Sequence, residues 1–80
     1  MNKYENFLIE WVGENSGIKK EIIDINANMF ENAYVDSLAL FGLLVDIEMN
    51  FGITLDENDI LDDKASTIKG FAEILIKKTK

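Results

Sequence analysis

The chain has 80 residues and a net charge of -7, and it contains no cysteine and no histidine. This composition excludes a disulfide framework, leaves only carboxylates as metal ligands, and disfavours nucleic acid as a partner because phosphates repel an acidic surface. No apolar run approaches the length of a membrane span, yet the hydrophobic content of 48% is too high for a disordered acidic tail. We therefore expect one folded domain over residues 1–80, monomeric and cytoplasmic, with no metal site and no membrane span.

Apolar residues near the amino terminus recur at the spacing of one helix face, which predicts an amphipathic helix. The residues of this face are Tyr4, Phe7, Leu8, Trp11 and Val12. We expect Gly13 and Gly17 to end the helix, because glycine is more favourable at helix ends than in helix interiors.

Residues 18–35 form a connection that is long for a structureless loop in so small a domain. We expect scattered apolar side chains to anchor it to the core, with a helical turn near residues 20–23. These anchors are Ile18, Ile22, Ile23, Ile25, Met29 and Phe30.

The second helix is expected to begin at Asp36 or Ser37 and to end near Asn50, before Gly52. A short helix is expected at residues 56–61, because the acidic side chains there suit a first helical turn.

The last helix is predicted to begin after Ser66 or Thr67, either of which can cap it. Its apolar face comprises Ile68, Phe71, Ala72, Leu75 and Ile76. Lys77, Lys78 and Lys80 complement the helix dipole at its carboxyl end. Three main helices, one short helix and a long first loop predict an all-α, four-helix bundle.

The second predicted helix is apolar on two opposite faces, although a chain this short has little material to cover both. One face comprises Leu40, Leu43, Leu44, Ile47 and Phe51. The other face, the second apolar face, comprises Leu38, Phe41, Val45 and Met49. Asp46 and Glu48 lie on the flanks between the two faces. Two interpretations stay open: both faces are core, or the second apolar face is exposed and docks a partner together with Glu48.

The tripeptide Asp36-Ser37-Leu38 stands at the start of this helix, inside a segment from Glu21 to Asp63 that has no lysine or arginine. Free backbone N–H groups and the helix dipole favour a phosphate group on a serine at this place. A catalytic serine needs a base, and the chain has no histidine, so Ser37 is better interpreted as the substrate of another enzyme.

Around this tripeptide the chain resembles the acyl carrier protein family, whose signature Asp-Ser-Leu at the head of the second helix stands here as Asp36-Ser37-Leu38. The resemblance covers nearly the whole chain. It includes the stretch Asp46-Ile47-Glu48-Met49-Asn50-Phe51-Gly52-Ile53 and the Ser66-Thr67-Ile68 segment before the last helix.

The resemblance implies that a phosphopantetheinyl transferase esterifies Ser37 with 4'-phosphopantetheine from coenzyme A, and that Asp36 belongs to the motif which this transferase recognises. The thiol of the arm would hold acyl or aminoacyl groups as thioesters. A free-standing carrier of this kind would pass them between acyl-loading and acyl-processing enzymes of fatty acid, polyketide or related syntheses. The cargo would lie beside apolar residues such as Leu40, Leu44 and Ile60.

Two departures from the family pattern bear on partners. Tyr34 stands where the family usually has glycine, and it either packs across the base of the arm or, as we favour, anchors the loop. Residues 39–42 are uncharged, whereas early helix residues of fatty-acid carriers are usually acidic. This difference favours a dedicated pathway, with a partner that has an apolar groove, over a general fatty acid synthase.

The alternative function, from a different class of protein, is that of an acidic helical interaction module that is never modified and has no need of Ser37. A small enzyme is disfavoured, because the sequence has no nucleophile–base pair, no phosphate-binding glycine loop and no metal-ligand cluster. We therefore expect a carrier and not a catalyst.

Overall fold

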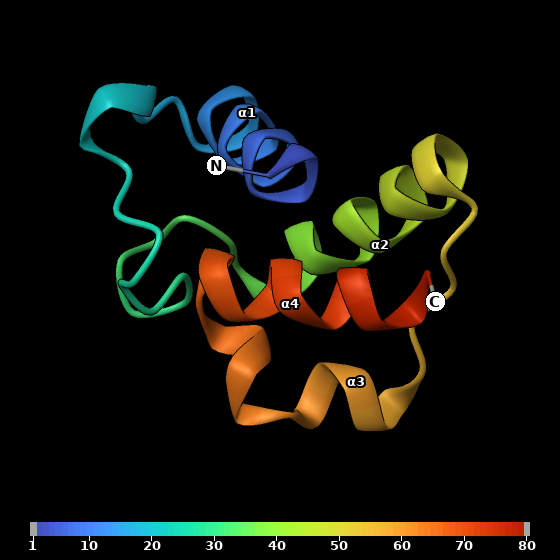
Figure 1. Ribbon diagram of the computed structural model, residues 1–80. Coiled ribbons are helices and arrows are strands. Elements are labelled where there is room, and N and C mark those ends of the chain that lie inside the picture. The colour runs from blue at the N-terminus through green and yellow to red at the C-terminus, as the bar shows by residue number, and fades with distance from the viewer. Residues whose placement is uncertain (1, 80) are drawn as a thin grey trace.

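The computed structural model describes residues 2–79, and within this range it consists of helices joined by loops (Figure 1). The elements are α1 (Lys3–Ser16), the 3-10 turn η1 (Lys20–Ile22), α2 (Ser37–Phe51), α3 (Glu57–Leu61), the 3-10 turn η2 (Asp63–Ser66) and α4 (Ile68–Lys78). The described part of the chain has a single isolated β-bridge, between Asn28 and Thr67, and no strand. The predicted all-α fold of three main helices, one short helix and a long first loop is confirmed.

The helix α1 begins with a reciprocal cap. The side chain of Asn2 accepts a hydrogen bond from the N–H of Glu5 at 2.8 Å, and the carboxylate of Glu5 accepts one from the N–H of Asn2 at 3.0 Å. The prediction that Gly13 ends the helix is wrong, because α1 continues to Ser16. A glycine inside a helix costs only about 1 kcal/mol. The end comes at Gly17, which adopts the left-handed conformation with φ of 75°.

The loop between η1 and α2 is pinned to the core by a few contacts. Met29 is completely buried, and its carbonyl oxygen accepts hydrogen bonds from the N–H groups of Tyr34 and Val35 at 2.8 and 3.2 Å. The hydroxyl of Tyr34 accepts a hydrogen bond from the N–H of Asp24 at 3.1 Å, so Tyr34 anchors the loop as predicted.

Two of the six predicted loop anchors are wrong, because Ile22 and Phe30 are exposed. The remaining four are buried or half-buried against the core. The helical turn expected near residues 20–23 is present as η1.

Capping determines where α2 and α4 begin. The carboxylate of Asp36 accepts a hydrogen bond from the N–H of Ala39 at 2.7 Å. The helix α2 ends at Phe51, and Gly52 follows it in the left-handed conformation, with φ of 69°. At α4 the cap is Thr67, whose hydroxyl accepts a hydrogen bond from the N–H of Gly70 at 3.0 Å.

The buried face of α4 is broader than predicted. Ile68, Phe71, Ala72 and Leu75 are buried as expected, but Ile74 is also buried and Ile76 is only half-buried. The reason is that α4 packs on α1 with one side and contacts η2 with another.

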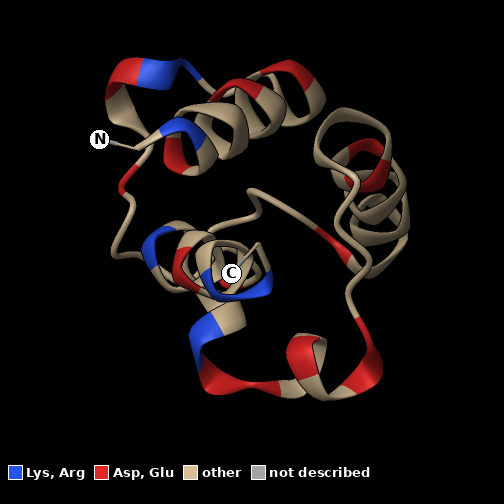
Figure 2. Ribbon diagram, turned by 45° about the vertical axis from the view of Figure 1, so that its right-hand side comes forward, with Lys and Arg blue, Asp and Glu red and all other residues tan. Residues whose placement is uncertain are grey.

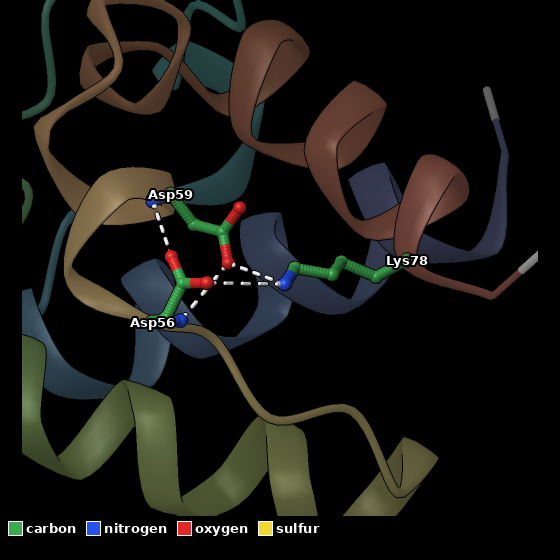
Figure 3. Close-up of polar contacts among 3 residues, drawn as sticks. All are labelled: Asp56, Asp59 and Lys78. Carbon is green, nitrogen blue, oxygen red and sulfur yellow. Dashed lines mark hydrogen bonds and ion pairs between the residues drawn. The ribbon is translucent and has the colours of Figure 1, made fainter.

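Lys78 ties the end of α4 to the short helix α3 (Figure 3). Its Nζ lies 2.8 Å from Oδ2 of Asp59 and 3.7 Å from Oδ2 of Asp56. The predicted complementation of the helix dipole by Lys77 and Lys78 is therefore joined by a specific ion pair, while Lys80 lies outside the described residues.

This ion pair shifts the pKa of both of its partners. The hydrogen bond from Lys78 lowers the pKa of Asp59, and the same bond raises the pKa of Lys78. The pair therefore stabilises the fold above the ordinary pKa of an aspartate and below that of a lysine, and the contribution is lost in acid as Asp59 becomes protonated. The contribution of the pair to stability is small, because both side chains contact solvent.

No helix between residues 2 and 79 combines the length and the apolar character needed to cross a membrane. The one long apolar helix of this range, α2, instead has one buried face and one exposed face.

Two glycine substitutions test the packing. A Cβ on Gly70 would lie 2.1 Å from the backbone oxygen of Lys64, so Gly70→Ala must displace η2 from α4. We expect it to lower the free energy of unfolding by about 1–3 kcal/mol, the usual cost of overpacking. A Cβ on Gly42 would approach only the ring of Trp11, at 3.9 Å. Gly42→Ala should therefore stabilise the protein by up to about 1 kcal/mol. Urea unfolding measures both, and equal effects would contradict this packing.

Candidate functional site

Ser37 is the first residue of α2, and its side chain is exposed to solvent. The N–H groups of Ser37 and Leu38 have no intrahelical acceptor because they belong to the first turn, whereas that of Ala39 is capped by Asp36. The positive end of the helix dipole lies at the same place. An accessible hydroxyl beside free N–H groups can accept and stabilise a phosphodiester, so this site fits a phosphate-linked group.

A hollow opens beside Ser37, between the end of α1, the loop before α2 and the start of α2 itself. It is lined by Asn15, Ser16, Phe30, Ala33, Tyr34, Val35, Asp36, Ser37 and Ala39. The sequence did not predict it, because Asn15 and Phe30 are brought near Ser37 only by the tertiary fold.

The second apolar face of α2 is exposed, so the interpretation that both faces are core is wrong. The exposed fractions of Leu38, Phe41, Val45 and Met49 are 81%, 68%, 55% and 79%. On the opposite side Leu43 and Ile47 are completely buried. The physical reason is that the described part of the chain, residues 2–79, packs against only one side of α2.

Apart from Asp36, which precedes α2 as its cap, the predicted attachment and partner residues lie on one side of α2. At 100° per residue, Ser37, Glu48 and the second apolar face occupy an arc of about 120°. Glu48 is exposed and lies at the edge nearest to Ser37. Leu40, Leu44 and Ile60, expected beside a cargo, are half-buried, and the position of a cargo stays a prediction.

Asp46 is held by α1. Nε1 of the buried Trp11 donates a hydrogen bond to Oδ2 of Asp46 at 2.7 Å. This contact was not predicted, since it joins residues 35 positions apart, although a buried indole N–H usually has an acceptor. Figure 2 shows that α2 carries little charge, whereas acidic residues gather around α3.

Comparison with known proteins supports a carrier site. The family model described as "Phosphopantetheine attachment site" matches residues 6–75. The acyl carrier protein of Rickettsia bellii (strain RML369-C) is 31% identical over 78 residues, covering 94% of this chain and 85% of its own length. The acyl carrier protein of Rickettsia canadensis (strain McKiel) is 34% identical over 74 residues, covering 92% and 80%. No solved structure matches the chain significantly.

The helical fold, the exposed serine at the head of α2 and these similarities agree on one class, the small proteins that carry a phosphate-linked arm. The chain belongs to the acyl carrier protein family, whose members bear a covalently attached 4'-phosphopantetheine group.

The contribution of Asp46 to the packing of α1 on α2 can be tested by measuring the free energy of unfolding. Asp46→Ala leaves the N–H of Trp11 without its acceptor, so we expect the free energy of unfolding to fall by about 1–3 kcal/mol. Glu48→Ala removes the same charge from the same helix at an exposed position and should change stability by less than about 0.5 kcal/mol. Urea unfolding followed by Trp11 fluorescence compares the two variants. Equal losses would mean that the Trp11–Asp46 contact does not hold α1 to α2.

Proposed function

We propose that the chain is an acyl carrier protein in which Ser37 bears the phosphopantetheine arm and presents thioester-bound intermediates to partner enzymes. The observation that carries this proposal is an accessible serine hydroxyl at the amino end of α2, in a chain that the family model covers from residue 6 to 75. We propose further that residues 1–80 act as one cytoplasmic domain, a monomer, and that it is not itself a catalyst.

The attachment chemistry assigns distinct tasks to the two residues of the motif. Oγ of Ser37 bonds to the phosphorus next to pantetheine in coenzyme A, the phosphoanhydride bond breaks, and adenosine bisphosphate leaves. The hydroxyl proton passes to a base of the phosphopantetheinyl transferase, since this chain has no histidine. Asp36 caps α2 and thereby holds Ser37 at the helix end. When bound, the arm supplies a thiol that holds acyl or aminoacyl groups as thioesters.

The second apolar face is proposed as the docking surface for acyl-loading and acyl-processing enzymes. It lies beside Ser37, so a partner that covers it is placed close to the arm. Asp46 is engaged with Trp11, which leaves Glu48 as the charged residue of α2 available to a partner. A groove that is mainly apolar therefore complements this face better than a basic patch, which favours a dedicated pathway over a general fatty acid synthase.

Modification of Ser37 is tested by intact mass. The purified protein is incubated with coenzyme A, magnesium and a broad-specificity phosphopantetheinyl transferase, beside a Ser37→Ala control. We expect the wild type to gain the mass of one phosphopantetheine and the variant to gain nothing, because the hydroxyl is the acceptor. If folded wild type stays unmodified by several transferases, the chain is better described as an unmodified interaction module.

Docking is tested on the modified protein with an acyl-loading enzyme that accepts the wild type. Phe41→Asp and Met49→Glu each place a charge on the second apolar face, and we expect each to lower kcat/KM about tenfold, equivalent to about 1.4 kcal/mol. Glu48→Gln serves as the control and should have a smaller effect.

The same assay separates apolar from charged docking. Apolar contacts are not screened by ions, so added salt should change kcat/KM of the wild type little. A steep salt dependence, or a larger effect of Glu48→Gln than of Met49→Glu, would contradict an apolar partner. Because the altered side chains are exposed, the helical circular dichroism signal should persist, and unfolding of both charged variants would instead mark these residues as core.

A further inference from the structure

We propose that the hollow beside Ser37 seats the neutral pantetheine part of the arm, on the side of the molecule formed by α1 and the long loop. This inference rests on the proposed attachment at Ser37 and adds the residues that would contact the arm. Ser37 itself lines the hollow, so an arm bonded to its Oγ begins beside it. A tethered group of this kind binds at a high effective concentration and needs only weak contacts.

One wall of the hollow is the loop before α2, and hydrogen bonds hold it in place. The side chain of Asn28 accepts hydrogen bonds from the N–H groups of Phe30 and Glu31, both at 2.9 Å. Ala33 adopts a left-handed conformation with φ of 61°, which is rare for alanine. Phe30 is left 43% exposed, although a large apolar side chain favours burial. This wall therefore presents apolar surface that the protein does not cover.

The opposite wall is the end of α1, and hydrogen bonds within the chain hold it as well. The hydroxyl of Ser16 donates a hydrogen bond to the carbonyl of Val12 at 2.6 Å and accepts one from the N–H of Ile18 at 3.1 Å. The side-chain amide of Asn15 donates to the carbonyl of Trp11 at 3.1 Å. Because both walls are fixed by contacts within the chain, seating the arm requires little ordering of the protein.

The lining matches the chemistry of pantetheine rather than that of an anion. It contains no lysine, and its charged residue is Asp36, the cap of α2. The phosphodiester would stay at the amino end of α2, where free N–H groups lie. Beyond it the arm is uncharged, with two methyl groups on one carbon followed by two amides. Phe30 and Ala33 are exposed and offer apolar contacts for the methyl groups, and Asn15 and Ser16 line the same hollow.

The test uses nuclear magnetic resonance of the modified protein, prepared with coenzyme A that is isotope-labelled in the pantetheine methyl groups. We expect cross-relaxation between these methyl protons and the ring protons of Phe30. The contact should be lost in Phe30→Ser and retained in Phe41→Ser, which removes an equally large exposed ring from the second apolar face. Both substitutions are at exposed positions, and amide spectra verify that each variant is folded.

The outcomes separate this inference from the proposed function. Intact mass establishes whether Ser37 was modified, and an unmodified serine would overturn both proposals. If Ser37 is modified but the methyl protons contact Phe41, or no residue of this chain, only the proposal that the hollow seats the arm is overturned. If Phe30→Ser slows modification by the transferase but leaves the methyl signals unchanged, the hollow contacts the transferase and not the arm. This result also overturns the proposal that the hollow seats the arm.

Discussion

The arrangement of the molecule depends on one constraint, the packing of α2 against the rest of the chain with only one side. Leu43 and Ile47 are completely buried on that side, where α2 joins the core that α1 and α4 also form. Residues 2–79 leave the other side of α2 uncovered, as expected of so small a core. Four large apolar side chains consequently contact water, at a cost of roughly 25 cal/mol for each Å² of apolar surface. That free energy is recovered when a partner covers the face, so the exposed side of α2 is suited to association.

Two local interactions determine what this side presents. The cap of Asp36 begins α2 at Ser37, which places the hydroxyl at the edge of the second apolar face. The hydrogen bond from Trp11 holds Asp46 against α1, which leaves Glu48 as the exposed acid of α2. The same contacts that fix the helix therefore also decide that its exposed side is apolar. Selection of a partner would then depend on shape and apolar contact more than on charge.

Much of the fold could be predicted from the sequence, because the helices rest on local signals. Apolar spacing predicted α1 and α4, and the Asp36-Ser37-Leu38 motif predicted the start of α2. Contacts between distant segments could not be predicted in this way. Gly13 and Gly17 look alike in sequence, and only the backbone conformation shows that Gly17 ends α1.

The candidate site, too, could be predicted from the sequence only in part. The motif located Ser37, but periodicity left both faces of α2 equivalent, since it describes each helix without its neighbours. The hollow beside Ser37 requires the end of α1 to meet the loop that contains Phe30, which no local pattern records. The Trp11–Asp46 contact likewise depends on how α1 crosses α2.

The most direct test of the exposed face compares two methionines within the same protein. Met49 is 79% exposed on α2, whereas Met29, in the loop before α2, is completely buried. Isotope labelling of the methionine methyl groups, followed by titration with a soluble paramagnetic agent, reports how closely solvent approaches each one. The structure predicts strong relaxation of the Met49 methyl group and little effect on that of Met29. Equal protection of the two methyl groups would show that the second apolar face is covered in the free protein, and would contradict the account of α2 as an open docking helix.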